Sequence, residues 1–208
     1  MYGWAEPIAL DVLDQANTLS IRQRVDIAEL AIGLEARNRF AIESDGGHRL
    51  FAFELGGRFR GWLLRQFLRH MRPFRMEVRD EQNRLFLRFH RPFRFVFHRL
   101  EIRDPQDRLL GAVRRRLTWI RRIYVIEDAQ GRPVAELFGP IFRPWTFEIR
   151  VRGNVEGHIR KRWSGLAKEM FTRADNFQLS FGPHLDPRLR PLCLGATFLI
   201  DIVHFERG

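Results

Sequence analysis

The chain has 208 residues, of which 45% are hydrophobic, enough for one substantial core and one or two domains. Its single cysteine, Cys193, excludes an intramolecular disulfide and any metal site built from several cysteines, and it indicates a reducing compartment. The net charge of +11 comes almost entirely from arginine and favours a surface that meets phosphate, in anionic lipid or nucleic acid. A genomic bias toward arginine is the alternative, but it explains the ratio of arginine to lysine and not the excess over 25 acidic residues.

The N-terminal stretch has neither a basic region nor a long apolar run, so we predict no signal peptide. We expect residues 1–16 to form an N-terminal extension. Residues 17–206 are expected to form a single domain, because no glycine- or serine-rich linker interrupts them.

Five β-hairpins are predicted in chain order, each from two apolar-rich runs joined by turn residues. The first turns at residues 45–47 and the last at residues 153–154. The three between them turn at Asp80, Asp104 and Asp128, which are 24 residues apart each time. Two further strands are expected at "NTLSIRQRV" and "NFQLSF". So many strands with short turns indicate a closed barrel or a sandwich.

Three stretches depart from the strand pattern. Residues 25–37 predict a short helix, and residues 56–75 place apolar side chains at helical spacing with arginines between them. Residues 192–205 are rich in apolar residues and contain one charged residue, Asp201, and one histidine. A membrane helix needs about 20 residues, so this run predicts a buried core helix instead.

The closing blocks "KRWSGLAKEMFTRADNFQLSF" and "LCLGATFLIDIVHFE" resemble the C-terminal signature of the phospholipid scramblase family. "GLEARNRFAI", the repeated "RPF" and "VEGHIRKRWSG" resemble its earlier blocks in the same order, and the resemblance runs from about residue 19 to residue 206. The family is similar in fold to Tubby and the LURP-one-related proteins. The resemblance implies a mainly β fold, a closed antiparallel β-barrel of about twelve strands around a hydrophobic C-terminal helix at about residues 187–204.

In activity, the resemblance implies calcium-stimulated, bidirectional, ATP-independent movement of phospholipids between leaflets, or a role as a membrane-associated adaptor. Some family members carry a proline-rich N-terminal region ahead of the barrel, and we expect no counterpart of it here. The family's cysteine cluster, palmitoylated in some members, corresponds to residues 56–71, which contain no cysteine. Attachment by acyl chains at that place is therefore excluded.

The family's calcium segment corresponds to residues 173–184. A loop of EF-hand type needs oxygen ligands at positions 1, 3, 5 and 12, which here are Arg173, Asp175, Phe177 and His184. Only Asp175 fits. Phe177, Leu179 and Phe181 alternate with polar residues, which is the period of a strand. We therefore expect this segment to be a strand and the protein to bind no cofactor. Calcium binding is implied by the family resemblance alone.

Two arginine-rich stretches with aromatic residues are candidates for lipid headgroup contact. The first lies in residues 56–71 and the second in residues 114–122. The candidate residues are Arg58, Arg60, Trp62, Arg65, Phe67, Arg69, Arg114, Arg115, Arg116, Trp119, Arg121 and Arg122. The alternatives are a segment packed on the barrel end for the first stretch, and a strand pair with a solvated basic face for the second.

No motif of a metal hydrolase, phosphate-binding loop or nucleophilic hydrolase is present, so we expect no enzymatic chemistry. The first functional hypothesis is a membrane-peripheral, lipid-handling protein at the inner face of the plasma membrane, with an anionic phospholipid surface as its partner. The alternatives are a soluble adaptor on a Tubby-like barrel and, supported by charge alone, a barrel that binds nucleic acid.

Overall fold

The structure is a computed structural model that describes residues 11–23, 36–55, 74–92, 99–116, 118, 121–162 and 176–204. Twelve strands form a closed barrel in which each strand pairs antiparallel with its neighbours in the chain, and β1 pairs with β12 to close the ring. Two short helical segments, α1 (Asp11–Asp14) and η3 (Pro187–Leu189), accompany the long helix α3 (Arg190–His204). The strands are β1 (Thr18–Gln23), β2 (Ala36–Ser44), β3 (Arg49–Leu55), β4 (Phe74–Asp80), β5 (Leu85–Arg91), β6 (Arg99–Arg103), β7 (Leu109–Arg116), β8 (Arg122–Asp128), β9 (Pro133–Gly139), β10 (Thr146–Val151), β11 (Asn154–Arg162) and β12 (Asn176–Phe181).

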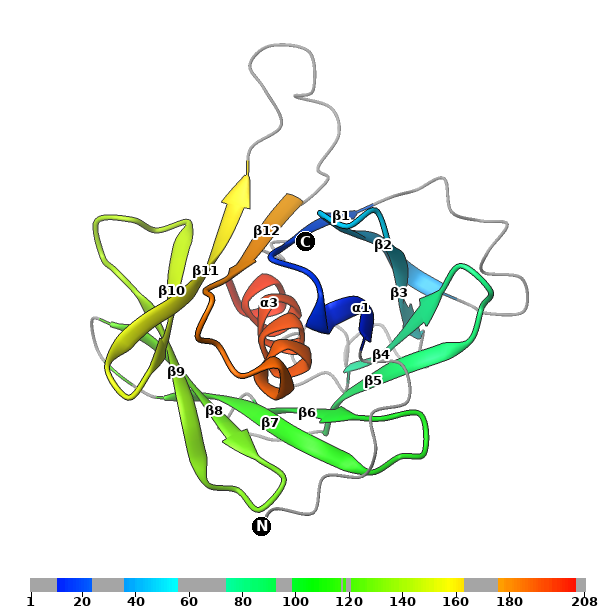
Figure 1. Cartoon of the computed structure of the whole chain (residues 1–208). Helices are drawn as coiled ribbons and strands as arrows, with labels where there is room; N and C mark the ends of the chain where they lie inside the picture. Colours follow the sequence, from blue (N-terminus) through cyan, green and yellow to red (C-terminus); the bar gives the residue numbers. More distant parts are fainter. Residues whose placement is uncertain are drawn as a thin grey trace, which may run out of the picture.

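The helix α3 fills the interior of this barrel, and Figure 1 shows the strands arranged around it. Its side chains from Leu192 to Ile200 are all buried, as a helix that is apolar on every side requires. The ring of Phe198 packs against Phe40 and Phe89, with centroid separations of 5.1 and 5.6 Å. A Cβ atom at Gly195 would lie only 2.7 Å from Ile102, so this glycine lets the helix approach β6 closely. The predicted closed barrel around a core helix is confirmed.

No helix within the described ranges combines the length and the apolar character that crossing a membrane requires.

The strands alternate buried and partly exposed side chains, as period-2 sequence patterns dictate. In β12, for example, Phe177, Leu179 and Phe181 are buried while Asn176, Gln178 and Ser180 are partly exposed. Leu19 of β1 lies opposite Leu179 at the closure of the barrel. The predicted strand within residues 173–184 is therefore confirmed for residues 176–181, whereas Asp175 lies outside the described residues.

Three of the hairpins share one turn sequence, Asp-x-Gln-x-Arg, at residues 80–84, 104–108 and 128–132. In each, the aspartate accepts hydrogen bonds from the backbone N–H and the guanidinium Nε of the arginine four residues later, over 2.6–2.9 Å. The residue before the arginine has a positive φ, which asparagine, aspartate and glycine tolerate best. All five predicted hairpins are confirmed.

The turn aspartates make the stability of the barrel sensitive to acid. Burial raises the pKa of Asp80 and of Asp128, but hydrogen bonds and charge from Arg84 and Arg132 outweigh burial and lower both values. A carboxyl with a lowered folded-state pKa stabilises the fold above its unfolded pKa of about 4, and this stabilisation is lost as the pH falls through the folded value. The unfolding free energy should therefore begin to fall below about pH 5 and should continue to fall as the pH passes through the lowered folded-state pKa values.

We expect the double variant Asp80→Asn/Asp128→Asn to lose roughly 1–2 kcal/mol at pH 6, because each side chain loses its charge-assisted bonds. It should also lose less stability on acidification than the unmodified protein. Urea unfolding followed by circular dichroism at each pH measures both quantities. Asp107→Asn is the matched control, since Asp107 is 65% exposed and its ion pairs are no shorter than 3.7 Å. Equal acid sensitivity in the two variants would contradict this account.

Two predicted helices fall largely outside the described residues, whereas the end of the expected N-terminal extension is described. Residues 25–35 lie outside the described residues, and Ala36 and Arg37 belong to β2, so the predicted helix does not reach residue 37. Residues 56–73 also lie outside them. The expected extension contains α1. Leu13 of this helix and Ala16, which lies two residues after it, are buried in the core of the barrel.

Candidate functional site

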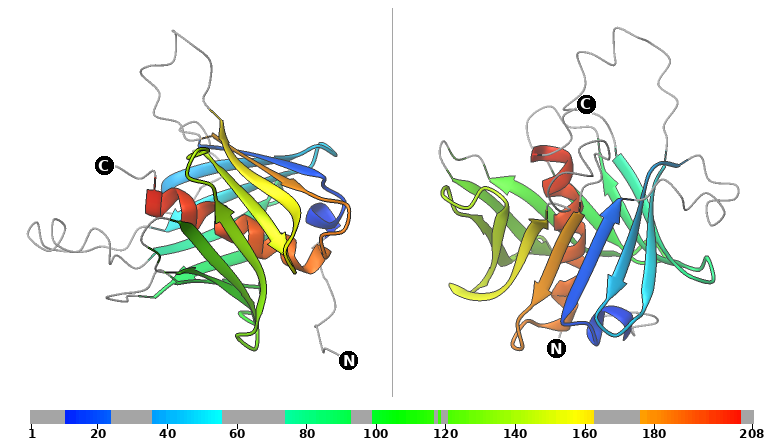
Figure 2. Two further views of the ribbon diagram at one scale, coloured as in Figure 1. Left: turned by 90° about the vertical axis from the view of Figure 1, so that its left-hand side faces the viewer. Right: turned by 90° about the horizontal axis from the view of Figure 1, so that it is seen from above.

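The two ends of the barrel differ in how the strands are connected. One end, the turn end, holds the five short hairpin turns together with α1 and the first turn of α3. The opposite end, the loop end, is where β3, β5, β7, β9 and β11 finish and where α3 finishes. Figure 2 shows α3 running between the two ends, with its last turn (red) away from α1. The connection from β9 to β10, residues 140–145, lies at the loop end.

The first group of predicted lipid-contact residues lies outside the described residues. These are Arg58, Arg60, Trp62, Arg65, Phe67 and Arg69. The strand residues that flank this segment, Leu55 at the end of β3 and Phe74 at the start of β4, both lie at the loop end. Trp119 of the second group also lies outside the described residues.

The arginines of the second group occupy different environments. Arg114 forms an ion pair of 2.5 Å with Glu127, which also pairs with Arg99 at 2.6 Å. Arg115 is partly exposed on β7, whereas Arg116 and Arg121 are exposed at the loop end. The structure therefore does not bring this group together as one surface, and it leaves two of its members facing solvent.

The side chain of Arg122 is turned toward the β9–β10 connection. Its guanidinium donates hydrogen bonds to the carbonyl oxygens of Pro140, Arg143 and Pro144. It also lies 4.8 Å from the centre of the Phe147 ring. Burial lowers the pKa of Arg122, but an arginine remains charged at neutral pH. Arg122 holds this connection in place.

The β9–β10 connection carries exposed apolar side chains that sequence reasoning missed. Ile141 is 54% exposed, Phe142 96% and Trp145 41%. The signal in the sequence is "PIFRPW", where two prolines interrupt the strand pattern around apolar residues that have no period-2 partners. This signal is weak because the run is short and lies between two hairpins with a clear strand pattern.

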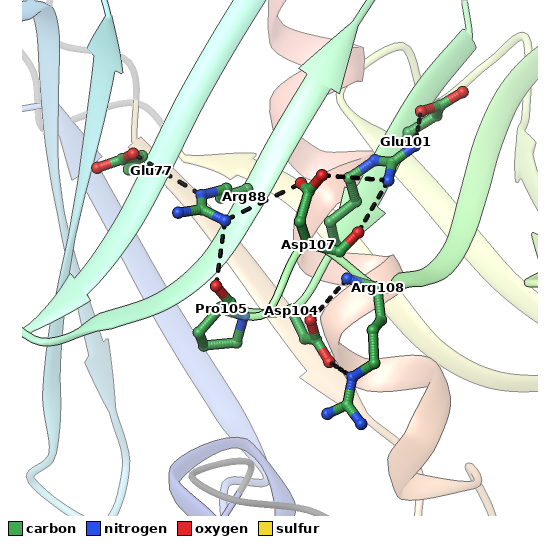
Figure 3. A network of polar contacts seen from close by, with 8 residues as sticks. Glu77, Arg88, Glu101, Asp104, Pro105, Asp107 and Arg108 are labelled. Carbon is green, nitrogen blue, oxygen red and sulfur yellow. Dashed lines mark hydrogen bonds and ion pairs between the residues drawn. The ribbon is translucent and has the colours of Figure 1, made fainter. Parts of the chain in front are cut away.

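Charges on the barrel wall are largely paired. Arg88 lies 3.9 Å from both Glu77 and Asp107, and its Nη1 donates to the carbonyl oxygen of Pro105 at 3.1 Å. Arg103 pairs with Glu101 at 2.9 Å. Figure 3 shows how Arg88 of β5 lies between Glu77 of β4 and the residues Pro105 and Asp107 of the β6–β7 turn. Arginine and carboxylate side chains therefore neutralise one another over this part of the barrel wall.

The charged side chains at the loop end, unlike those on the barrel wall, are mostly arginines without an acidic partner among the described residues. Six arginines there are exposed, and none forms an ion pair with another described residue; they are Arg22, Arg75, Arg116, Arg121, Arg143 and Arg162. Among the described residues of this end, the acidic ones are Glu54 and Asp201, which are only 4% and 5% exposed. The turn end instead carries the acidic side chains of the hairpins, including Asp45, Asp80 and Asp128. Unbalanced positive charge is therefore concentrated at one end of the barrel.

Neither metal chemistry nor a reactive thiol is indicated by the described residues. Across the described ranges, no three histidine, cysteine or acidic side chains are grouped as a metal ion would require. Cys193 is fully buried in α3, and burial raises the pKa of its thiol to about 12. A thiol with such a pKa is protonated and inert at neutral pH.

Comparison with known proteins gives consistent matches along the whole chain. The family model named Scramblase matches residues 3–207. Phospholipid scramblase 2 of Bos taurus is 30% identical over 96% of this chain and 72% of its own length, and phospholipid scramblase 2 of Homo sapiens is 28% identical over 97% and 71%. Phospholipid scramblase 1 of Mus musculus is 29% identical over 97% of this chain and 65% of its own length. No solved structure matches the chain. Because the family model extends over nearly every residue, from before α1 to beyond α3, this protein belongs to the scramblase family.

Proposed function

We propose that this protein binds an anionic membrane surface through the loop end of its barrel and moves phospholipid between leaflets without ATP. The observation that carries the proposal is the set of six exposed arginines at the loop end, with no exposed acidic side chain among the described residues there. Membership of the scramblase family supplies the class of ligand. The relatives are named phospholipid scramblases.

The binding free energy expected from these arginines favours membrane binding by the loop end. Each arginine near an anionic leaflet contributes about 1 kcal/mol, so several acting together suffice for stable peripheral attachment. The paired acidic residues of the turn end gain nothing from such a surface, and the protein should therefore bind in one orientation. Anionic lipid is concentrated in the cytoplasmic leaflet, so the inner face of the plasma membrane is the proposed location.

The proposal includes the predicted residues beyond the described part of the chain. Arg58, Arg60, Arg65 and Arg69 belong to a segment that leaves and re-enters the barrel at the loop end. Four of the five tryptophans, Trp62, Trp119, Trp145 and Trp163, belong to connections between strand ends at that same end. Tryptophan is enriched at membrane interfaces, which agrees with a loop end that faces lipid.

Charge reversal at the loop end tests the binding surface. We expect Arg116→Glu/Arg121→Glu to weaken cosedimentation with vesicles containing phosphatidylserine by at least about tenfold, since two contributions of about 1 kcal/mol are removed and two repulsive charges added. The control Arg49→Glu/Arg152→Glu makes the same charge change at the turn end and should bind nearly normally. Both variants should melt close to the unmodified protein, because the replaced side chains are exposed or weakly paired. Equal losses in the two variants would show that net charge, not the loop end, determines binding.

The transport activity is tested by exchange of dye-labelled lipid in reconstituted vesicles. We expect exchange without ATP, and an equal rate with micromolar calcium or with a chelator, since only Asp175 of the calcium segment is a suitable ligand. Vesicle binding without exchange would favour the adaptor hypothesis. Stronger binding to duplex DNA than to anionic vesicles at matched salt would favour the nucleic-acid hypothesis.

A further inference from the structure

The β9–β10 connection is the most apolar exposed feature of the described structure. The described chain has four strongly exposed large hydrophobic side chains, and Ile141, Phe142 and Trp145 of this connection are three of them. Grouped apolar side chains in contact with water mark a surface that another phase or molecule covers. The fourth, Val155, is 46% exposed at the turn end and stands alone.

Several hydrogen bonds fix the backbone of the connection in the arrangement that exposes its apolar side chains. Arg122 donates to three of its carbonyl oxygens, and two prolines restrict its backbone. Backbone hydrogen bonds run from Arg143 N–H to the Pro140 carbonyl at 3.2 Å and from Lys161 N–H to the Trp145 carbonyl at 2.9 Å. A loop that is already ordered loses little conformational entropy when it binds. The exposure of Phe142 is thus imposed by the fold.

The surroundings of the connection identify what covers it. Arg143 lies next to Phe142 in the chain and is exposed without an ion pair among the described residues, as are Arg116 at the end of β7 and Arg121 just before β8. An apolar tip surrounded by unpaired cations matches the boundary between anionic headgroups and acyl chains. Trp145, which is 41% exposed, has the amphipathic ring that this boundary favours.

We propose that residues 140–145 are a membrane-insertion loop, in which Ile141 and Phe142 enter the acyl boundary of an anionic bilayer while Arg143 contacts headgroup phosphates. The inference rests on the proposed function, because it takes the loop end as the surface that meets lipid. It adds a specific, preorganised element to that surface. Insertion of two large side chains gives attachment a component that salt does not screen.

A fluorophore at position 142 tests insertion directly. Cys193 is fully buried with a raised thiol pKa, so Phe142→Cys provides the reactive thiol for an environment-sensitive dye. We expect a blue shift and a rise in intensity when vesicles of phosphatidylcholine and phosphatidylserine are added, and quenching by nitroxide lipids. Val155→Cys, labelled in the same way at the turn end, is the control and should respond to neither.

Binding without a dye gives the second measurement. Phe142→Ser should weaken cosedimentation with the same vesicles by about tenfold, because the partition of a partly buried phenyl ring is lost. Val155→Ser should bind like the unmodified protein, and neither variant should melt differently, since both side chains are exposed. The loss in Phe142→Ser should persist at high salt, unlike that caused by charge reversal.

The outcomes separate this inference from the proposed function. If the unmodified protein does not bind anionic vesicles, both fail. If it binds, but position 142 stays in water and Phe142→Ser binds normally, the insertion loop is wrong and the proposed function stands. A protein dimer that dissociates in Phe142→Ser, measured by sedimentation in the absence of lipid, would assign the loop to contact between copies and would likewise overturn its insertion.

Discussion

Replacing Leu199 with aspartate is expected to unfold the barrel. Leu199 is 0% exposed in the middle of the core cluster that α3 forms with the inward faces of the strands. Removing the leucine side chain loses about 1.5–3 kcal/mol of stabilising free energy from apolar burial. The new carboxylate must then be buried or protonated, which costs further free energy. The total, on the order of 5 kcal/mol or more, rivals the whole stability of a domain.

Circular dichroism melts and urea unfolding measure the effect, with Leu199→Met as the matched control. Methionine has a similar volume and no charge, so this variant should lose less than about 1.5 kcal/mol. If Leu199→Asp instead remained a folded barrel and merely failed to bind vesicles, α3 would be a membrane element. That outcome would contradict the role of α3 as the filling of the core.

The fold was largely predictable because its signals are local. Turn residues separated by 24 positions and period-2 apolar runs predict hairpins without knowledge of distant contacts. The length of the apolar run near the C-terminus, compared with the thickness of a bilayer, predicts a core helix. The burial of Leu13 and Ala16 was not predictable in this way. Those residues owe their place to contacts with α3, nearly the whole chain away.

The candidate site was less predictable because it depends on which charges are paired. In the sequence, Arg114, Arg116 and Arg122 are equivalent members of one basic stretch. In the structure, Arg114 pairs with Glu127 on the neighbouring strand, and Arg122 supports the β9–β10 connection. Of these three arginines, only Arg116 is exposed and forms no ion pair with another described residue. Pairing follows from strand register, which a basic run in a sequence does not contain.

The second large effect is expected at Arg190, the first residue of α3. Its guanidinium Nη1 donates to the carbonyl oxygens of Leu13, at 2.5 Å, of Ala16, at 3.0 Å, and of Asp14. The same group lies 5.0 Å from the centre of the Phe181 ring. Arg190 thereby binds the segment of residues 13–16 to the start of α3 at the turn end of the barrel.

Arg190→Leu should lower the unfolding free energy by about 3 kcal/mol. The variant loses charge-assisted hydrogen bonds that each contribute roughly 1.5–3 kcal/mol. This loss is larger than the desolvation free energy that is recovered when the cation is no longer buried. Hydrogen exchange should accelerate most at the amides of residues 12–19, and urea unfolding gives the free energy. The control is Arg188→Leu, two residues earlier, whose half-exposed guanidinium pairs with Asp186 at 2.6 Å and should contribute less than about 1 kcal/mol. Similar losses in both variants, or unchanged exchange at residues 12–19 in Arg190→Leu, would show that Arg190 does not hold the N-terminal segment in place.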